Sequence, residues 1–435
     1  MSAYGGIEPG RKAGGSGPGA GTPRSQALLA AVLPLLAFLV ARPLSAQSPE
    51  PDILAFRFTL AGAAVAGPEA GSGRVWIVSE DRTLYILDDS GRAVGRRVWT
   101  DGIPGWIAPD PFGRALLPAV DGSLVLVNRA GLEVWRVRPG APVARPPVFG
   151  ADGRSFAAAD SRLLTWSASG RLLWSADQAA GVVIGPYVRF TASGETRVVV
   201  ALGDGTVREY REDGILLSSV PGDQVRIRSS SVPSDVPAVG PPSTLCGLGD
   251  GLLLAYRDGS VSIRDERGEE TVRLRLASPV IAAAGDRAEA WLLLSGGSVV
   301  RLREDGTVSG TTPTGIRDAR DIRVFPERVL VLGPRGVASL AKDGQVYRDL
   351  SLRNAPRMPA ATSSGIVLSA GEDWILYAYR FEGALGEPSR PAPGYVDFAA
   401  ARARAEEEIF WNPGFGDDAA LRELDLDGAS FFDRL

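Results

Sequence analysis

One pattern of apolar and polar residues recurs eight times along the chain. Each copy has an apolar strand, a turn, a strand in which apolar and polar residues roughly alternate, and a glycine turn. The closing glycines are Gly91, Gly131, Gly170, Gly214, Gly268, Gly306, Gly344 and Gly383, at intervals of 38 to 54 residues. A strand that is apolar throughout is buried on both faces, and an alternating strand on one face. Each copy therefore predicts neighbouring strands of one sheet.

The two turns of a copy lie nine residues apart, for example at Gly122 and Gly131 or at Gly205 and Gly214. Many of these turns are Asp-Gly pairs, because a tight hairpin needs a positive φ, which Gly adopts freely and Asp tolerates. Calcium loops are the alternative, but they need runs of alternating acidic residues, which the chain lacks. We therefore interpret the pairs as hairpin turns.

A further strand on each side of this pair, such as 186–191 and 215–220, gives four antiparallel strands in about 40 residues, the size of a propeller blade. The predicted fold is all-β: an eight-bladed β-propeller of four-stranded antiparallel blades over residues 53–383. Residues 56–67 also read in register with 272–283, which run from an outer strand into the next inner strand. Residues 53–60 should therefore form the outer strand of the last blade, beside 366–370 and 375–380, and close the ring.

The repeat resembles that of the pyrroloquinoline-quinone (PQQ)-like propellers, in which a Trp follows the turn glycine by four residues. Gly131 and Trp135 match this step, as do Gly170 and Trp174, whereas Trp99 follows Gly91 by eight residues. The strands Leu84-Tyr85-Ile86-Leu87 and Leu376-Tyr377-Ala378-Tyr379 match the family's Leu-Tyr-Ala-Leu-like strand. The resemblance implies that Trp99, Trp135 and Trp174 are structural residues that dock one blade on the next.

Composition weighs against an enzyme. The chain has no His, which excludes Ser-His-Asp and Cys-His catalytic units and His-ligated zinc. Quinoprotein dehydrogenases of the resembled family carry an adjacent Cys-Cys pair, which the single Cys246 cannot supply. We expect no quinone, no other cofactor, no metal site and no catalytic residue. The alternative is a propeller that binds carbohydrate or another small ligand, and acts as a glycosidase or lyase through carboxylates meeting at the channel mouth.

The net charge of −4 argues against a nucleic-acid partner. The family's non-enzymatic members include the BamB-like propellers of the bacterial envelope, which assist outer-membrane protein assembly. The resemblance implies a non-catalytic scaffold whose partners are other envelope proteins, with a role in outer-membrane protein assembly as its narrower form. The chain departs from those propellers in having an acidic tail and no lipid-attachment cysteine.

The N-terminus predicts export. Basic residues precede the apolar stretch 27–40, which is too short to span a bilayer, and the small Ala46 follows at a suitable cleavage position. We expect a signal peptide over 1–46 and a linker over 47–52, with an uncleaved anchor as the alternative. No cysteine lies directly after the apolar stretch, at the position that lipid attachment requires, so lipoprotein processing is excluded. The protein is expected in the periplasm or associated with the outer envelope.

Two segments depart from the repeat. Residues 221–242 lengthen one connection by roughly 15 residues; they are either a tolerated surface insertion or a partner-binding edge formed by Arg226, Ile227 and Arg228. The tail, 384–435, has ten acids and four arginines in 395–435, together with several aromatic residues. We expect a partly helical tail whose aromatic residues, Trp411 foremost, pack on the propeller or bind a partner.

Overall fold

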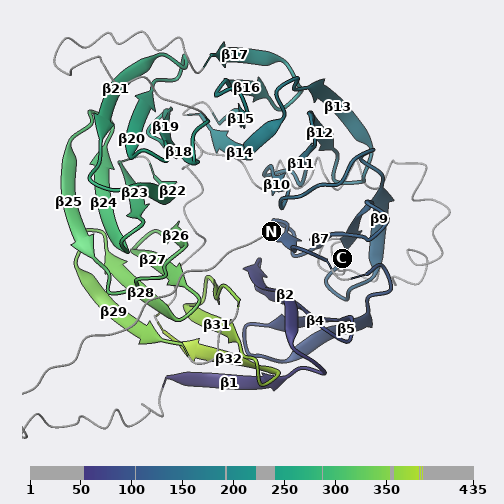
Figure 1. The fold of residues 1–435 in the computed structure, drawn as a ribbon. Helices are drawn as coiled ribbons and strands as arrows, with labels where there is room; N and C mark the ends of the chain where they lie inside the picture. Colours follow the sequence, from purple (N-terminus) through teal and green to yellow (C-terminus); the bar gives the residue numbers. More distant parts are fainter. Residues whose placement is uncertain are drawn as a thin grey trace, which may run out of the picture. The chain divides into compact units, whose positions relative to one another are not determined.

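The computed structural model describes residues 53–381 with gaps at 103, 192–193, 222–240, 287 and 353–356, together with Gly383 and Leu385. Every element in this part of the chain is a β-strand, and the strands form eight four-stranded sheets arranged in a ring (Figure 1). Neighbouring strands within each sheet run antiparallel, as at β3 and β4. This confirms the all-β, eight-bladed propeller. No helix of the described residues is long and apolar enough to cross a bilayer.

The first seven blades follow the chain in order, each from its innermost to its outermost strand. Blade 1 contains β2 (Ala64–Gly71), β3 (Arg74–Ser79), β4 (Thr83–Asp88) and β5 (Ala93–Val98), and blade 2 contains β6 (Ala108–Pro109), β7 (Ala115–Pro118), β8 (Leu124–Val127) and β9 (Glu133–Val137). Blade 3 contains β10 (Val148–Phe149), β11 (Ser155–Ala159), β12 (Arg162–Trp166) and β13 (Leu172–Asp177), and blade 4 contains β14 (Val182–Phe190), β15 (Thr196–Leu202), β16 (Val207–Arg211) and β17 (Leu216–Val220). Blade 5 contains β18 (Thr244–Leu248), β19 (Gly251–Ala255), β20 (Ser260–Arg264) and β21 (Glu270–Arg275), and blade 6 contains β22 (Val280–Gly285), β23 (Glu289–Leu294), β24 (Ser298–Arg303) and β25 (Val308–Pro313). Blade 7 contains β26 (Asp321–Val324), β27 (Arg328–Gly333), β28 (Gly336–Ala341) and β29 (Val346–Ser351).

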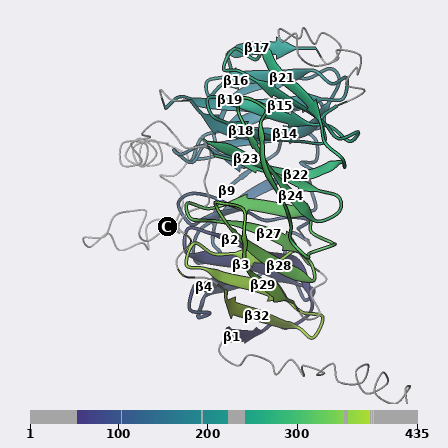
Figure 2. The same ribbon diagram turned by 90° about the vertical axis from the view of Figure 1, so that its left-hand side faces the viewer.

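Blade 8 closes the ring with strands from both ends of the propeller. Its inner strands are β30 (Ala360–Ala361), β31 (Ile366–Ala370) and β32 (Ile375–Arg380), and its outer strand is β1 (Leu54–Thr59). β1 lies beside β32 in both views (Figures 1 and 2), and Phe58 pairs with Leu376. The predicted ring closure is therefore confirmed. Gly383 forms no outer hairpin, because β1 supplies the fourth strand.

The glycine turns create a bulge in blades 1 to 7. In each of them the register shifts between the third and fourth strands just before the glycine, as between Ile86 and Leu87. The glycines of these seven turns all have a positive φ, for example 84° at Gly91. A Gly in this conformation allows the extra residue of the bulge, which explains why glycine recurs here.

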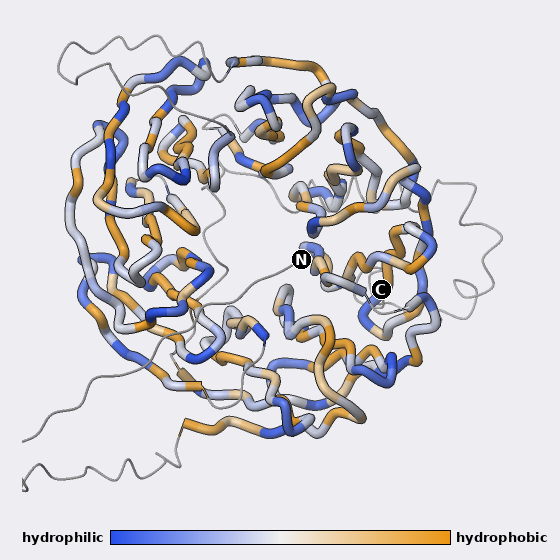
Figure 3. The backbone as a smooth tube through the Cα atoms, viewed as in Figure 1, coloured by the Kyte–Doolittle hydropathy of each residue, from blue (hydrophilic) through white to orange (hydrophobic). Residues whose placement is uncertain are grey.

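The hydrophobic core lies between blades. One cluster joins Trp76 and Ile86 of blade 1 to Ala115 and Val125 of blade 2, and comparable clusters lie between the other neighbouring blades. Figure 3 shows the apolar stretches within the strands and many hydrophilic ones at the turns. Radial packing therefore buries surface that no isolated blade could cover.

Aromatic side chains dock some outer strands on the glycine turn of the next blade. Trp135 donates a hydrogen bond from Nε1 to the Ala168 carbonyl at 3.0 Å, and a Cβ on Gly170 would lie 2.8 Å from its ring. Trp174 donates to the Glu212 carbonyl at 2.8 Å and covers Gly214 in the same way.

The two remaining aromatic positions lie at other interfaces. Trp99 is buried in the cluster between blades 1 and 2. Phe56 of β1, which the sequence pattern did not single out, lies against Gly91, where a Cβ would collide with its ring. Phe56 thus occupies the docking position at the closure of the ring.

Candidate functional site

The inner strands of the propeller and the residues beside them line an open cavity of about 530 Å³ in the central channel. Its walls are mainly apolar and come from seven blades; they include Ile107, Phe149, Val188, Phe190, Ala283 and Ala284. The polar side chains that line it are Glu69, Arg323, Tyr187 and Cys246. A cavity of this size, apolar with a few polar groups, has the general character of a small-molecule site.

Glu69 on β2 and Arg323 on β26 approach each other in the channel although blade 8 lies between their blades. The Oε2 atom of Glu69 is 4.0 Å from Nη2 of Arg323, and the Nε of Arg323 donates a hydrogen bond to Oδ2 of Asp321 at 3.0 Å. The intervening inner strand, β30, contains only Ala360 and Ala361. These small side chains leave room for the long arginine to reach across blade 8.

Burial and charge shift the pKa values in this group. Burial, the largest effect, and the nearby charge of Asp321 raise the pKa of Glu69, although Arg323 lowers it. Burial disfavours the charged guanidinium of Arg323, but Asp321 and Glu69 outweigh this effect and raise its pKa. Two carboxylates therefore converge here on one guanidinium.

The shifted pKa of Glu69 makes stability depend on pH. The pKa of Glu69 is higher in the folded than in the unfolded chain. Its contribution to the free energy of unfolding is therefore complete at low pH and is lost as the pH rises through the folded-state pKa. We expect Glu69→Gln to gain free energy of unfolding relative to the wild type as the pH rises from about 4, near the pKa of a glutamate in the unfolded chain. Urea unfolding of both proteins across this range measures the difference. A difference that stays constant with pH would contradict the expectation.

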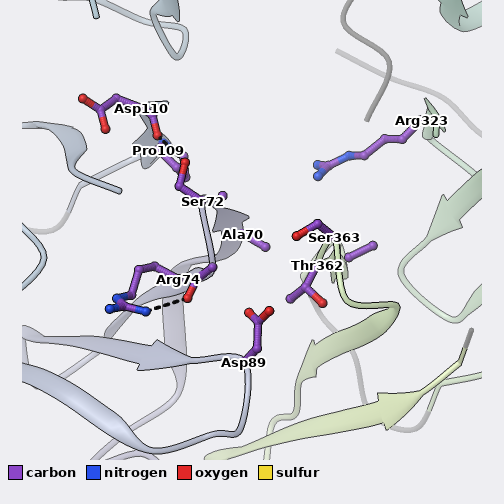
Figure 4. Close-up of a pocket in the computed structure, with 12 residues that line it drawn as sticks. Ala70, Ser72, Arg74, Asp89, Pro109, Asp110, Arg323, Thr362 and Ser363 are labelled. Carbon is purple, nitrogen blue, oxygen red and sulfur yellow. Dashed lines mark hydrogen bonds between the residues drawn. The ribbon is translucent and has the colours of Figure 1, made fainter. Parts of the chain in front are cut away.

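A second cavity, of about 120 Å³, lies beside the β2–β3 turn, at the junction of blades 1, 2 and 8 (Figure 4). Ser72 donates hydrogen bonds to the carbonyls of Asp110 and Pro111, which ties blade 1 to blade 2. The carboxylate of Asp110 is fully buried against Arg114 at 2.6 Å and so is unavailable to a ligand. Asp89 and Arg323 point toward the space in Figure 4. Arg323 lines both cavities.

The two other polar side chains of the channel, Cys246 and Tyr187, show no feature that would make them reactive. Cys246 is buried, and burial raises the pKa of its thiol to about 12, so the reactive thiolate is strongly disfavoured. The hydroxyl oxygen of Tyr187 accepts a hydrogen bond from the Gly247 amide at 2.8 Å. Within the described ranges, no group of three His, Cys, Asp or Glu side chains is placed to hold a metal ion.

An exposed tryptophan lies at the other end of the strands from the β2–β3 turn. Trp374, in the β31–β32 turn, is 52% exposed and has a φ of 65°. At the equivalent turn position, blades 2, 4, 5 and 6 have Gly122, Gly205, Gly259 and Gly297, also with positive φ. A bulky residue in this conformation is unusual and costs free energy. The sequence signal was Asp373-Trp374 in place of Asp-Gly, which the sequence analysis did not use.

The outer edge of blade 4 is also apolar. Ile215, Leu216 and Leu217 are three consecutive exposed apolar side chains at the start of β17. β17 pairs with β16 and is the last strand of its sheet, so no strand of the described residues pairs with its other edge. The segment 221–242 follows directly, between β17 and β18, as predicted. Arg226, Ile227, Arg228 and Trp411 lie outside the described residues, as do 1–46 and most of the tail.

Comparison with known proteins agrees with this architecture. Residues 120–289 match the family model described as outer membrane protein assembly factor BamB. This match and the observed fold confirm the resemblance to the PQQ-like repeat propellers. No curated protein sequence matches the chain significantly.

Solved structures share the fold at low sequence identity. BamB from Moraxella catarrhalis is 14% identical with a TM-score of 0.53, over 76% of this chain and 97% of that chain. Sqt1 from Saccharomyces cerevisiae is 10% identical with a TM-score of 0.57, over 75% and 99%. The computationally designed Ika8 protein is 15% identical with a TM-score of 0.54, over 74% and 98%. These similarities describe the fold alone.

Proposed function

We propose that this chain, a β-propeller of the PQQ-like repeat family, is exported to the bacterial envelope and acts there as a non-catalytic scaffold that binds other proteins. Assistance to outer-membrane protein assembly, in the manner of the BamB-like propellers, is the narrower form of the proposal. The family-model match supports the class of function. The observation that carries the proposal is Trp374.

Trp374 combines two costs that a contact with another protein would offset. Its left-handed backbone conformation costs about 1–2 kcal/mol in a residue with a Cβ, and its ring exposes a large apolar surface to water. Tryptophan is among the residues that contribute most to protein–protein binding, because a rigid aromatic ring buries a large area with little loss of side-chain entropy. We infer that Trp374 inserts into a pocket of a partner protein.

The turn that carries Trp374 is held rigidly. Its carbonyl accepts a hydrogen bond from the Leu60 amide at 2.8 Å. Asp373 accepts hydrogen bonds from the Tyr377 hydroxyl and, at 3.3 Å, from the Ile375 amide. A pre-organised contact residue loses less entropy on binding, which favours affinity.

The open edge of β17 supplies a second proposed contact. An extended segment of a partner can add to such an edge through backbone hydrogen bonds, with side-chain contacts to Ile215, Leu216 and Leu217. Arg226, Ile227 and Arg228 would extend this surface with positive charge. Trp411 in the tail remains a further predicted contact.

Photo-crosslinking from single positions in living cells tests the proposal. A photoreactive residue at position 374 should give covalent adducts with an envelope protein. The matched control is position 82, because Arg82 has a φ of 66° in the equivalent turn of blade 1. Adducts equally strong from both positions, or from neither, would contradict a binding role for Trp374.

Deletion of residues 223–238 tests the second contact. We expect the deletion to weaken binding of the partner identified by crosslinking about tenfold, and to leave thermal stability almost unchanged, because shortening a surface loop alters closure entropy little. Titration calorimetry and thermal unfolding measure the two effects. Unchanged affinity would show that the segment is only a tolerated insertion.

A further inference from the structure

The channel cavity has the physical features of a small-molecule site independent of any protein partner. Its volume of about 530 Å³ lies within the range of known ligand pockets. Phe149, Val188 and Phe190 contribute apolar wall from two adjacent blades, and Ala283 contributes wall from blade 6. A ligand that fills this space must therefore have an apolar body.

The charges of the channel select the polar part of the ligand. The Nε of Arg323 donates a hydrogen bond to Asp321, and Asp321 therefore lies closer to the guanidinium than Glu69 does. Glu69 is 4.0 Å from the same guanidinium, which is longer than a hydrogen bond, and no donor among the described residues reaches its carboxylate. Two carboxylates and one guanidinium leave a net negative charge when all are ionised. Glu69 thus presents unused acceptor capacity inside the cavity.

The net charge and the free acceptor of this group distinguish three classes of ligand. When Glu69 is ionised, an anion would be repelled by the net negative charge of the group. A neutral apolar molecule would displace water from Glu69 without replacing its hydrogen bonds, which costs free energy. An ammonium group can donate to Glu69 and neutralise the excess charge.

We propose that the channel binds a small organic ammonium ion, with the ammonium group on Glu69 and the apolar body against the walls of the cavity. Arg323 is then a positioning residue, which Asp321 holds beside the carboxylate. The apolar walls supply most of the affinity, and Glu69 selects the charge of the ligand.

Calorimetric titration of the full chain with three molecules of matched shape tests the proposal. Hexylammonium should bind saturably. Hexanol should bind at least about tenfold more weakly than hexylammonium, and hexanoate should bind most weakly of the three. In a series from butyl- to octylammonium, affinity should rise about fourfold per methylene while the cavity still has room. Absence of saturable hexylammonium binding, or preferential binding of hexanoate, would overturn the proposal.

Two variants and one control locate the site. Glu69→Gln keeps the shape of the side chain and should weaken hexylammonium about tenfold while changing hexanol less than about twofold. Ala283→Phe fills the cavity and should abolish binding of both. Glu80→Gln removes an exposed acid in the β3–β4 turn and should change neither. Unchanged hexylammonium affinity in both Glu69→Gln and Ala283→Phe would place the binding elsewhere and refute the assignment. Cooperative thermal unfolding establishes that each variant is folded.

Discussion

A chain that starts at residue 61 should be much less stable than one that starts at residue 53. The shorter chain lacks β1, so blade 8 loses its outer strand and the pairing of Phe58 with Leu376. It also loses Phe56 from its position against Gly91, and with it one of the contacts that join blade 8 to blade 1. We expect the free energy of unfolding to fall by more than about 4 kcal/mol, which is exceptional for a local change.

The chain that starts at residue 53 is the matched control, because it lacks the same N-terminal residues but keeps β1. Urea unfolding monitored by circular dichroism measures the difference between the two. Equal unfolding midpoints and slopes would show that closure by β1 contributes little to stability. A second variant, Phe56→Ala in the full chain, isolates the docking contact and should lose about 3 kcal/mol.

Replacement of Trp374 by glycine should change stability and binding in opposite directions. Relief of the left-handed conformation returns about 1–2 kcal/mol, and the greater freedom of glycine in the unfolded chain cancels about 0.4–1 kcal/mol of it. We therefore expect Trp374→Gly to be more stable than the wild type. Its affinity for the crosslinked partner should fall by about 2 kcal/mol, or roughly thirtyfold.

Arg82→Gly provides the comparison for this variant, because Arg82 has nearly the same φ in the equivalent turn of blade 1. It should gain stability by the same mechanism and bind the partner as the wild type does. Thermal unfolding and calorimetric titration of the two variants separate backbone strain from recognition. Unaltered partner affinity in Trp374→Gly would remove the main support for the proposed interaction surface.

The architecture was predictable because its signals are local and repeated. A hairpin needs a residue that tolerates positive φ, so the turn glycines marked seven of the eight blades, and strand periodicity marked the buried strands between them. The match of residues 56–67 to 272–283 gave the position of β1 in the last blade. The docking role of Trp135 and Trp174 could be predicted for the same reason, because each follows a turn glycine by the same number of residues.

The contents of the channel depended on tertiary structure alone. Glu69 and Arg323 lie far apart in the chain and share no motif; they meet because blades 1 and 7 converge on one axis and because β30 has only two alanines between them. Phe56 takes a docking role only because ring closure places it against Gly91. The sequence by itself determined the strands, the turns and the number of blades, since these follow from neighbouring residues. Only the folded ring decided which side chains from distant blades face one another in the channel.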